Sequence, residues 1–238
     1  MLEPQMGIIT FRVEGNNDPS SALFSRRAHA PPWGSGVTIG RGYDMKKRDA
    51  SAVKSTLLRV GVPPDHARLL SGGVGLVGQA SKLFVQKEEI NQIVITELAQ
   101  VKLFKVVYTE KYNYAKKMCM KKGVQDKYGK CDWNSFPKEL VELIVDLTYR
   151  GDYTGGDINT RRYLQPPIVN KDWEALKKAL WMIPGAKKIY SRTKKRIELV
   201  DIIIRKENLK SWDPIAKSQQ KRQSFYWWES GFIFSQSP

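Results

Sequence analysis

Cysteine is scarce in this chain of 238 residues, where only Cys119 and Cys131 occur. Two cysteines exclude a disulfide-rich scaffold, because folds of that class rely on several cross-links in place of a large core. The two thiols stand twelve positions apart across a stretch rich in Gly and Lys. One disulfide and two free thiols therefore both stay open, while a metal site is not expected, since no histidine lies nearby.

Long apolar runs are also absent. The best candidate, residues 199–204, is interrupted by Asp201 and followed by Arg205, whereas a membrane-spanning helix needs roughly 18 apolar residues. The first 15 residues include Glu3 and Arg12 and show no basic stretch followed by an apolar one. We therefore expect no transmembrane segment and see no signal peptide, so export would use another route or a leader that is absent here.

Acidic residues are too few to balance the basic ones: 24 Asp and Glu stand against 40 Lys and Arg, which gives a net charge of +16. Such a charge favours polyanionic partners, namely nucleic acid, anionic lipid or the anionic polymers of a bacterial envelope. The basic residues are scattered and accompany no known nucleic-acid-binding motif, so nucleic-acid binding rests on composition alone. An apolar content of 41% excludes a disordered polyelectrolyte.

The order of the expected elements indicates an α+β fold. Residues 1–48 are rich in turn formers and contain one short alternating stretch around Val37 and Ile39, which predicts a small β-hairpin. Helical spacing begins after Asp49, a good N-cap residue, and dominates from there on. The expected helices cover about residues 49–60, 63–70, 90–108, 140–147, 171–182 and 187–205.

Residues 140–147 are apolar on most of the helix circumference, so this helix is expected in the centre of the molecule. The predicted domain covers residues 1–205, with a β-containing lobe over about 1–48, a helical body over about 49–205 and a cleft between them. The remaining residues, 206–238, form an aromatic tail that is expected to pack on the body.

Two weak signals are given structural interpretations. Residues 73–78 match the G-x-G-x-x-G pattern, but a helical segment precedes them and no alternation of strands and helices follows, so an inter-helix turn is expected rather than a dinucleotide site. His29 and His66 accompany no nucleophile motif and are expected on the surface.

Two carboxylic acids stand out near the N-terminus. Glu14 follows the apolar residues of segment 8–13, and Asp44 ends a glycine-rich string at residues 36–44. Apolar surroundings favour a protonated carboxyl, whereas a polar turn favours a carboxylate, and glycosidic bond cleavage needs one of each. Thr38 could orient the attacking water through its hydroxyl.

These strings resemble a known family. Glu14 and the glycine after it, followed by Thr-Ile-Gly-Arg-Gly at residues 38–42, resemble the active-site segment of phage-type lysozymes. The continuation to Asp44 is closer to the lysozyme-like toxin domain of pesticin. The resemblance implies that Glu14 is the general acid, that Asp44 is the second carboxylate, and that Thr38 holds the water. It departs from the phage enzymes at Leu23, where they carry their catalytic Asp, and at Tyr43, where they carry His.

The resemblance extends over roughly residues 8–205. Asp18 is the alternative second carboxylate if Asp44 points away. Residues 143–153 are similar to the central helix and cleft loop of these lysozymes, and residues 192–198 resemble the late helix whose cation contacts the catalytic Glu. The implied sugar contacts are Tyr43, Arg150, Asp152 and Tyr153, and the candidate cations are Arg192, Lys194, Lys195 and Arg196.

The resemblance implies a lysozyme-like muramidase with no metal or cofactor. It would hydrolyse the β-1,4 bond between N-acetylmuramic acid and N-acetylglucosamine in bacterial peptidoglycan, with inversion, as an antibacterial or lytic monomer that is secreted or delivered to the envelope. Anionic envelope polymers are the other expected partners, and no nucleic acid is expected. A basic protein that binds nucleic acid, or one that binds wall sugars without cutting them, is the alternative.

Overall fold

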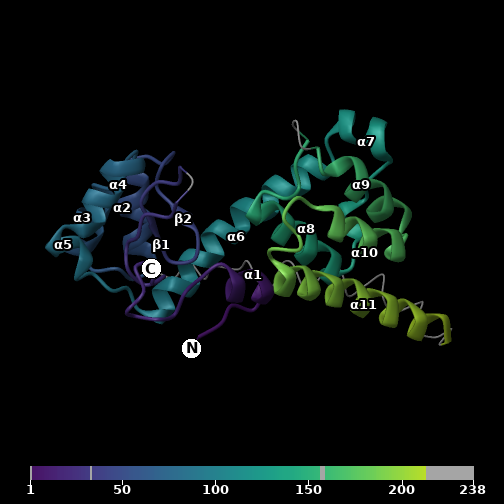
Figure 1. The fold of residues 1–238 in the computed structure, drawn as a ribbon, viewed down its shortest axis with the longest axis horizontal. Helices are drawn as coiled ribbons and strands as arrows, with labels where there is room; N and C mark the ends of the chain where they lie inside the picture. The colour runs from purple at the N-terminus through teal and green to yellow at the C-terminus, as the bar shows by residue number, and fades with distance from the viewer. Residues whose placement is uncertain (1, 33, 156–158, 213–238) are drawn as a thin grey trace, which may run out of the picture. The chain divides into compact units, whose positions relative to one another are not determined.

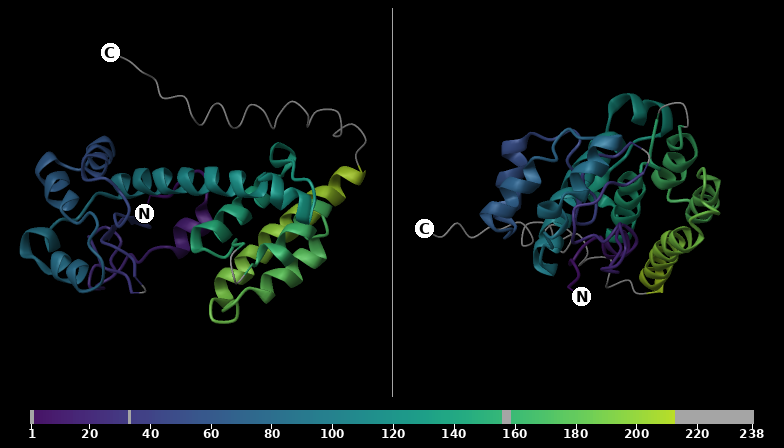
Figure 2. Two further views of the ribbon diagram at one scale, coloured as in Figure 1. Left: turned by 90° about the horizontal axis from the view of Figure 1, so that it is seen from above. Right: turned by 60° about the vertical axis from the view of Figure 1, so that its left-hand side comes forward.

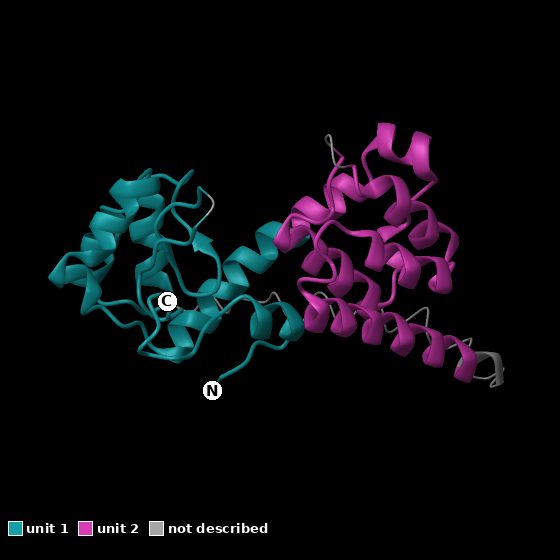
Figure 3. Cartoon of the chain, in the orientation of Figure 1, with its two compact units in different colours: residues 1–112 teal, residues 113–238 magenta. Residues whose placement is uncertain are grey.

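The described part of the chain is mainly helical and includes a small antiparallel sheet, in agreement with the α+β class (Figure 1). This computed structural model describes residues 2–32, 34–155 and 159–212. Its residues divide into two compact units, 1–112 and 113–238 (Figure 3). The boundary falls inside α6, Glu97–Cys119, which is one uninterrupted helix (Figure 2). No helix in the described ranges combines the length and the apolar character needed to cross a membrane.

Unit 1 begins with a short helix and a hairpin and continues with small helices. Its elements are α1 (Ile8–Val13), β1 (Thr38–Ile39), β2 (Tyr43–Asp44), α2 (Ala50–Arg59), α3 (Pro64–Ser71), α4 (Gly78–Gln86), α5 (Glu88–Asn91) and the first part of α6. The predicted cap is confirmed, because the Asp49 side chain accepts a hydrogen bond from the amide of Ala52 at the start of α2. Pro64 opens α3, as the sequence predicts.

The predicted hairpin is present and its register is simple. Thr38 pairs with Asp44 and Ile39 with Tyr43, so residues 40–42 form a three-residue loop. Gly40 and Gly42 have φ values of 66° and 93°, a region of backbone conformation that side-chain-bearing residues rarely adopt. The glycines of this string are therefore explained by the turn.

His29 is buried, so the prediction of a surface position is wrong. Only 8% of it is exposed, and its backbone exchanges two hydrogen bonds of 2.9 Å with that of Thr38. Its Nδ1 lies 3.0 Å from the carbonyl oxygen of Arg27. Segment 27–30 thus flanks β1 on the side opposite β2, a long-range backbone pairing that no local pattern reveals.

Burial lowers the pKa of His29 below its ordinary value of 6.5, although the contact with the Arg27 carbonyl acts in the opposite sense. Neutral His29 therefore contributes stability that is complete above pH 6.5 and is lost as the pH falls through the lowered pKa. We expect the melting temperature of the wild type to fall between pH 7.5 and 5.5, and that of His29→Gln to fall less. His66→Gln is the matched control and should keep the slope of the wild type.

The predicted helix over residues 90–108 is wrong in its first part. The structure ends α5 at Asn91 and starts α6 at Glu97, with an extended stretch between them. In that stretch the amide of Ile95 donates to the Arg26 carbonyl at 2.9 Å, and Val94 pairs with Arg27. Backbone pairing with residues 26–27 therefore replaces the helix that the apolar spacing predicts. Val94, which that spacing places on the buried face, is 41% exposed.

Unit 2 is helical. Its elements are the last turns of α6, α7 (Lys122–Tyr128), the 3-10 turn η1 (Trp133–Ser135), α8 (Lys138–Arg150), α9 (Arg161–Asn170), α10 (Trp173–Met182) and α11 (Tyr190–Trp212). Every residue of α8 from Leu143 to Tyr149 is buried, so the prediction of a central helix is confirmed. α11 packs on α8 and α10, and α10 also packs on α9.

Two further differences from the sequence analysis are an additional helix and a longer one. α9 was not expected, because Pro166 and Pro167 lie inside it and prolines usually break a helix. α11 runs to Trp212, beyond the expected end at residue 205. The rest of the predicted aromatic tail, residues 213–238, lies outside the described residues.

Candidate active site

Thr38 and Asp44 pair across the hairpin, and the side chains of both are hydrogen-bonded to the backbone of Gly36. The amide of Gly36 donates to Asp44 Oδ1 at 3.2 Å, and the hydroxyl of Thr38 donates to the carbonyl of Gly36 at 3.2 Å. The amide of Lys46 also donates to Asp44 Oδ1, at 2.7 Å. The two predicted side chains therefore share a scaffold of backbone hydrogen bonds.

The position of Gly36 requires the absence of a side chain. A Cβ there would lie 2.8 Å from Asp44 Oδ1 and 2.9 Å from the Cα of Lys46. Separations below 3.0 Å do not occur for real Cβ atoms, and the Lys46 backbone cannot yield cheaply. The first glycine of the string is thus explained by close approach to the Asp44 carboxylate.

Glu14 is the residue that ends α1. Its amide donates to the carbonyl of Thr10 at 2.9 Å, and the residue is half-buried. α1 has only six residues, too few to be stable alone, so packing must hold it in place. Phe11 supplies that packing: it is fully buried and meets the ring of Phe104 edge-on, with the centroids 5.0 Å apart.

Arg41 connects the hairpin loop with residues on both sides of Glu14. Its guanidinium donates to the carbonyl of Phe11 and to Asn17 Oδ1, and it lies over the Phe11 ring at 4.0 Å from the centroid. The side chain is buried, with 1% exposed. Within unit 1, the hairpin that carries Thr38 and Asp44 is therefore fixed against the segment that carries Glu14.

Gly15 leaves room for this arginine. A Cβ at Gly15 would overlap the guanidinium of Arg41 and lie 2.8 Å from Ser25 Oγ. We expect Gly15→Ala to displace Arg41 and to lower the free energy of unfolding by about 1–3 kcal/mol, the usual cost of overpacking. Urea unfolding measures this. Gly123→Ala is the control, because that position opens into free space and should tolerate a methyl group; equal stability of both variants would contradict the tight contact.

Tyr43, a predicted sugar contact, is 1% exposed in this structure. Arg48 covers its ring at 4.2 Å from the centroid and forms a two-pronged ion pair with Glu110 of α6 at 2.7 and 2.8 Å. The same arginine donates from Nε to the carbonyl of Asp44 at 2.9 Å. This placement favours a role for Tyr43 in supporting β2, and its sugar contact stays a prediction.

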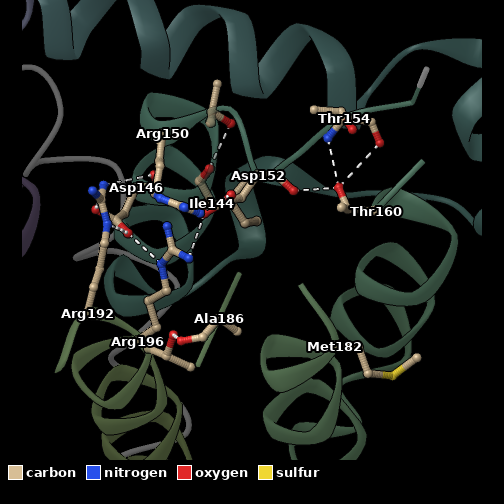
Figure 4. Close-up of polar contacts among 12 residues, drawn as sticks. Ile144, Asp146, Arg150, Asp152, Thr154, Thr160, Met182, Ala186, Arg192 and Arg196 are labelled. Atoms are coloured by element: carbon tan, nitrogen blue, oxygen red, sulfur yellow. Dashed lines mark hydrogen bonds and ion pairs between the residues drawn. The ribbon is translucent and has the colours of Figure 1, made fainter. Parts of the chain in front are cut away.

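The other predicted contacts belong to unit 2. There Arg150 pairs with Asp152, and Asp152 Oδ2 lies 2.8 Å from Nη1 of Arg196 without hydrogen-bond alignment (Figure 4). Asp152 is 8% exposed, while the Arg150 side chain keeps 29% of its surface in solvent. Of the two, Arg150 is the better placed to meet a ligand.

Asp146 is the centre of this charged cluster. It lies in the middle of α8 with 1% exposed, and it accepts hydrogen bonds from Arg192 at 2.7 Å and from Arg196 at 2.7 Å (Figure 4). Burial acts to raise the pKa of Asp146, but the two guanidiniums outweigh it and hold that pKa below its ordinary value. Arg192 and Arg196 stand one helical turn apart on α11, so both reach the same carboxylate.

Tyr153 is buried, with 3% exposed, and its hydroxyl bonds to Gln165 Oε1 of α9. Thr160 fixes the loop that carries it, because its hydroxyl donates to the Asp152 carbonyl and accepts from the amide of Thr154 (Figure 4). This setting favours a core role for Tyr153, and its sugar contact remains a prediction.

The remaining candidates are more exposed. Lys194 lies over the ring of Tyr190 at 4.8 Å, and Lys195 is half-buried on the same helix. Asp18, the alternative carboxylate, accepts from the amide and hydroxyl of Ser20 at 2.9 and 2.7 Å, so it caps a surface turn. Leu23 is 44% exposed.

Sequence analysis did not single out Arg41 or Asp146. Arg41 stands at the variable position of Thr-Ile-Gly-x-Gly, and its only signal is a charge between two turn glycines. Asp146 is an acid inside an otherwise apolar helix, and such a residue must find a buried partner. No group of His, Cys, Asp and Glu in the described ranges is arranged to hold a metal ion.

The chain was also compared with known proteins. No curated protein matches it. The family model described as Domain of unknown function (DUF8812) matches residues 7–189, which is more than half of the chain, and the chain therefore belongs to that family.

Proposed function

We propose that this protein is a muramidase that hydrolyses the β-1,4 bond between N-acetylmuramic acid and N-acetylglucosamine in bacterial peptidoglycan. The observation that carries the proposal is the pairing of Thr38 with Asp44 on a hairpin whose loop residue Arg41 is bonded to the segment of Glu14. These are the side chains that acid/base hydrolysis requires, and all of them lie in unit 1.

Glu14 acts as the general acid. Its carboxyl protonates the glycosidic oxygen as the bond breaks, while positive charge develops on the sugar ring. Position matters because the proton donor must lie within hydrogen-bond reach of the leaving oxygen. The Phe11 anchor and the Arg41 contacts fix the end of α1, so they limit the positions that Glu14 can adopt.

Asp44 and Thr38 serve the opposite face of the sugar. In the described part of the chain both hydrogen bonds to the Asp44 carboxylate fall on Oδ1, so we assign Oδ2 to the attacking water. Thr38 helps to position that water. Direct attack by water inverts the anomeric centre and requires carboxyl groups about 6.5–9.5 Å apart, whereas about 5–5.5 Å suits a covalent intermediate.

The charge of +16 suits the anionic polymers that surround this substrate. We propose that the protein acts as a monomer after secretion or delivery to the envelope, as an antibacterial or lytic enzyme without cofactor. Added salt should slow the attack on intact walls, because it screens long-range attraction.

Purified peptidoglycan tests the proposal. Digestion should release reducing ends, and borohydride labelling should identify them as muramic acid, with the α-anomer formed first if water attacks directly. Ends of glucosamine would assign a different bond. Retention on walls without new ends would mean binding without hydrolysis. Retention on DNA with a steep salt dependence and no released ends would favour a nucleic-acid-binding protein.

A further inference from the structure

Cys119 and Cys131 meet in the interior of unit 2. Cys119 is the last residue of α6, and Cys131 lies between α7 and η1. Both are free thiols, with 0% and 4% exposed, and they lie close enough for each to affect the ionisation of the other. The helix α7 lies between them in sequence, so the chain turns back on itself to bring the thiols together.

One side chain of α7 holds the two ends of this turn. Gln125 donates from Nε2 to the carbonyl of Met120 at 2.6 Å and accepts at Oε1 from the amide of Cys131 at 3.3 Å. The backbone next to Cys119 and the backbone of Cys131 are therefore tied to the same amide group. This clamp is independent of the thiols and keeps the pair in place.

The surroundings of the two thiols differ. Gln165 donates to Cys119 Sγ at 3.3 Å, and the hydroxyl of Tyr153 bonds to Gln165. The hydrogen bond from Cys131 is the main cause that lowers the pKa of Cys119, against the effect of burial, and the positive charge of Arg161 acts in the same direction. The same bond and burial raise the pKa of Cys131. Because Gln165 donates a hydrogen bond to its Sγ, Cys119 is the better placed of the two to act as a thiolate nucleophile.

We infer that Cys119 and Cys131 are a site of disulfide modification, closed by exchange with a small-molecule disulfide. The geometry points to it, since Gln125 bonds both to the residue after Cys119 and to Cys131, so two buried neighbouring thiols need little movement to bond. Both thiols are buried, so exchange proceeds through local opening around α7, a short helix in which Val124 is the buried residue. The inference does not depend on the proposed hydrolysis.

The exchange balances with oxidised glutathione as the oxidant. The thiolate of Cys119 attacks one sulfur of oxidised glutathione, which forms a mixed disulfide and releases one glutathione thiolate. Cys131 then loses its proton to solvent and attacks Sγ of Cys119, and the second glutathione thiolate leaves. Two electrons pass from the cysteines to glutathione, and the two thiol protons end on the two released thiolates or in the buffer.

The test uses the full-length protein in its reduced form. It is incubated in glutathione buffers of increasing oxidising strength, quenched with a maleimide that adds a large mass to each free thiol, and analysed by gel and by peptide mass spectrometry. We expect both thiols to disappear together, a mass loss of about 2 Da, and a cross-linked peptide that contains both cysteines. The melting temperature should rise by roughly 5–10 °C, because the bond closes a short loop, and a reductant should reverse every change.

Single variants check the order of the steps. In Cys131→Ser the reaction should stop at a mixed disulfide between Cys119 and glutathione. In Cys119→Ser the mixed disulfide on Cys131 should form at least tenfold more slowly than the one on Cys119 in Cys131→Ser. Three results would overturn the inference. They are glutathione adducts on the wild type without a cross-link, a cross-link between two molecules, and two thiols that stay reduced even in mild urea. These readouts count thiols and masses, so failure of the muramidase proposal would leave them unchanged.

Discussion

Replacing Glu14 by Gln is expected to lower the rate at which reducing ends are released from peptidoglycan by a hundredfold or more. The amide keeps the size and shape of the side chain but has no acidic proton to give to the leaving oxygen, and general acids commonly contribute 10²–10⁴-fold to such reactions. The defect should appear in kcat, because the proton is transferred only in the transition state. Circular dichroism and the melting temperature should stay close to those of the wild type.

Asp18→Asn is the matched control for this experiment. It also removes one carboxylate from the N-terminal segment, but Asp18 caps an exposed turn through Ser20, so near-normal turnover is expected. Asp44→Asn should impair turnover strongly. Full activity of Glu14→Gln would exclude the assigned acid, and an inactive Asp18→Asn with active Asp44→Asn would transfer the second role to Asp18.

Replacing Asp146 by Asn is expected to lower the free energy of unfolding of unit 2 by about 3–5 kcal/mol, since it removes the buried carboxylate that two guanidiniums share. Arg192 and Arg196 both bond to this carboxylate, and Arg196 is fully buried. A loss of this size corresponds to a fall in melting temperature of roughly 10 °C or more. Thermal unfolding followed by circular dichroism measures it.

The effect of Asp146→Asn has a defined pH range. The pKa of Asp146 is below its ordinary value of 3.8, so its contribution to stability is complete above that pH and is lost as the pH falls through the lowered pKa. The difference between wild type and variant should thus be constant from pH 5 to 8. Asp126→Asn is the control, because its pair with Lys122 is exposed and such pairs contribute little. Equal melting temperatures for wild type and Asp146→Asn would contradict the buried ion cluster.

The parts of the fold that could be predicted depend on neighbours in sequence. The helix capped by Asp49, the helix opened by Pro64 and the three-residue hairpin loop all follow from local residue types. The break between α5 and α6 does not, because it depends on the pairing of Ile95 with Arg26. α9 was missed because Pro166 and its neighbour predict a break, whereas the structure shows a helix that packs against α7 and α10.

In the candidate site, too, local contacts could be predicted from the sequence and long-range contacts could not. The pairing of Thr38 with Asp44 follows from glycines that close a tight turn between them, so sequence alone predicts that these two meet. The attachment of the hairpin to α1 depends on Arg41, which reaches a carbonyl 30 positions away. Likewise the partners of Asp146 lie 46 and 50 positions away, on a helix whose cations the resemblance assigns to Glu14 instead.

Gly36, whose backbone is hydrogen-bonded to the side chains of both Thr38 and Asp44, can serve as an NMR probe of the site. Its nitrogen donates to one side chain and its oxygen accepts from the other, so its amide resonance in a nitrogen–proton correlation spectrum should respond to a change at either. Glycine amides commonly resonate apart from the crowded centre of such spectra. Gly36 is therefore a natural reporter for titrations with wall fragments, and it can follow occupancy even in a variant that no longer turns over.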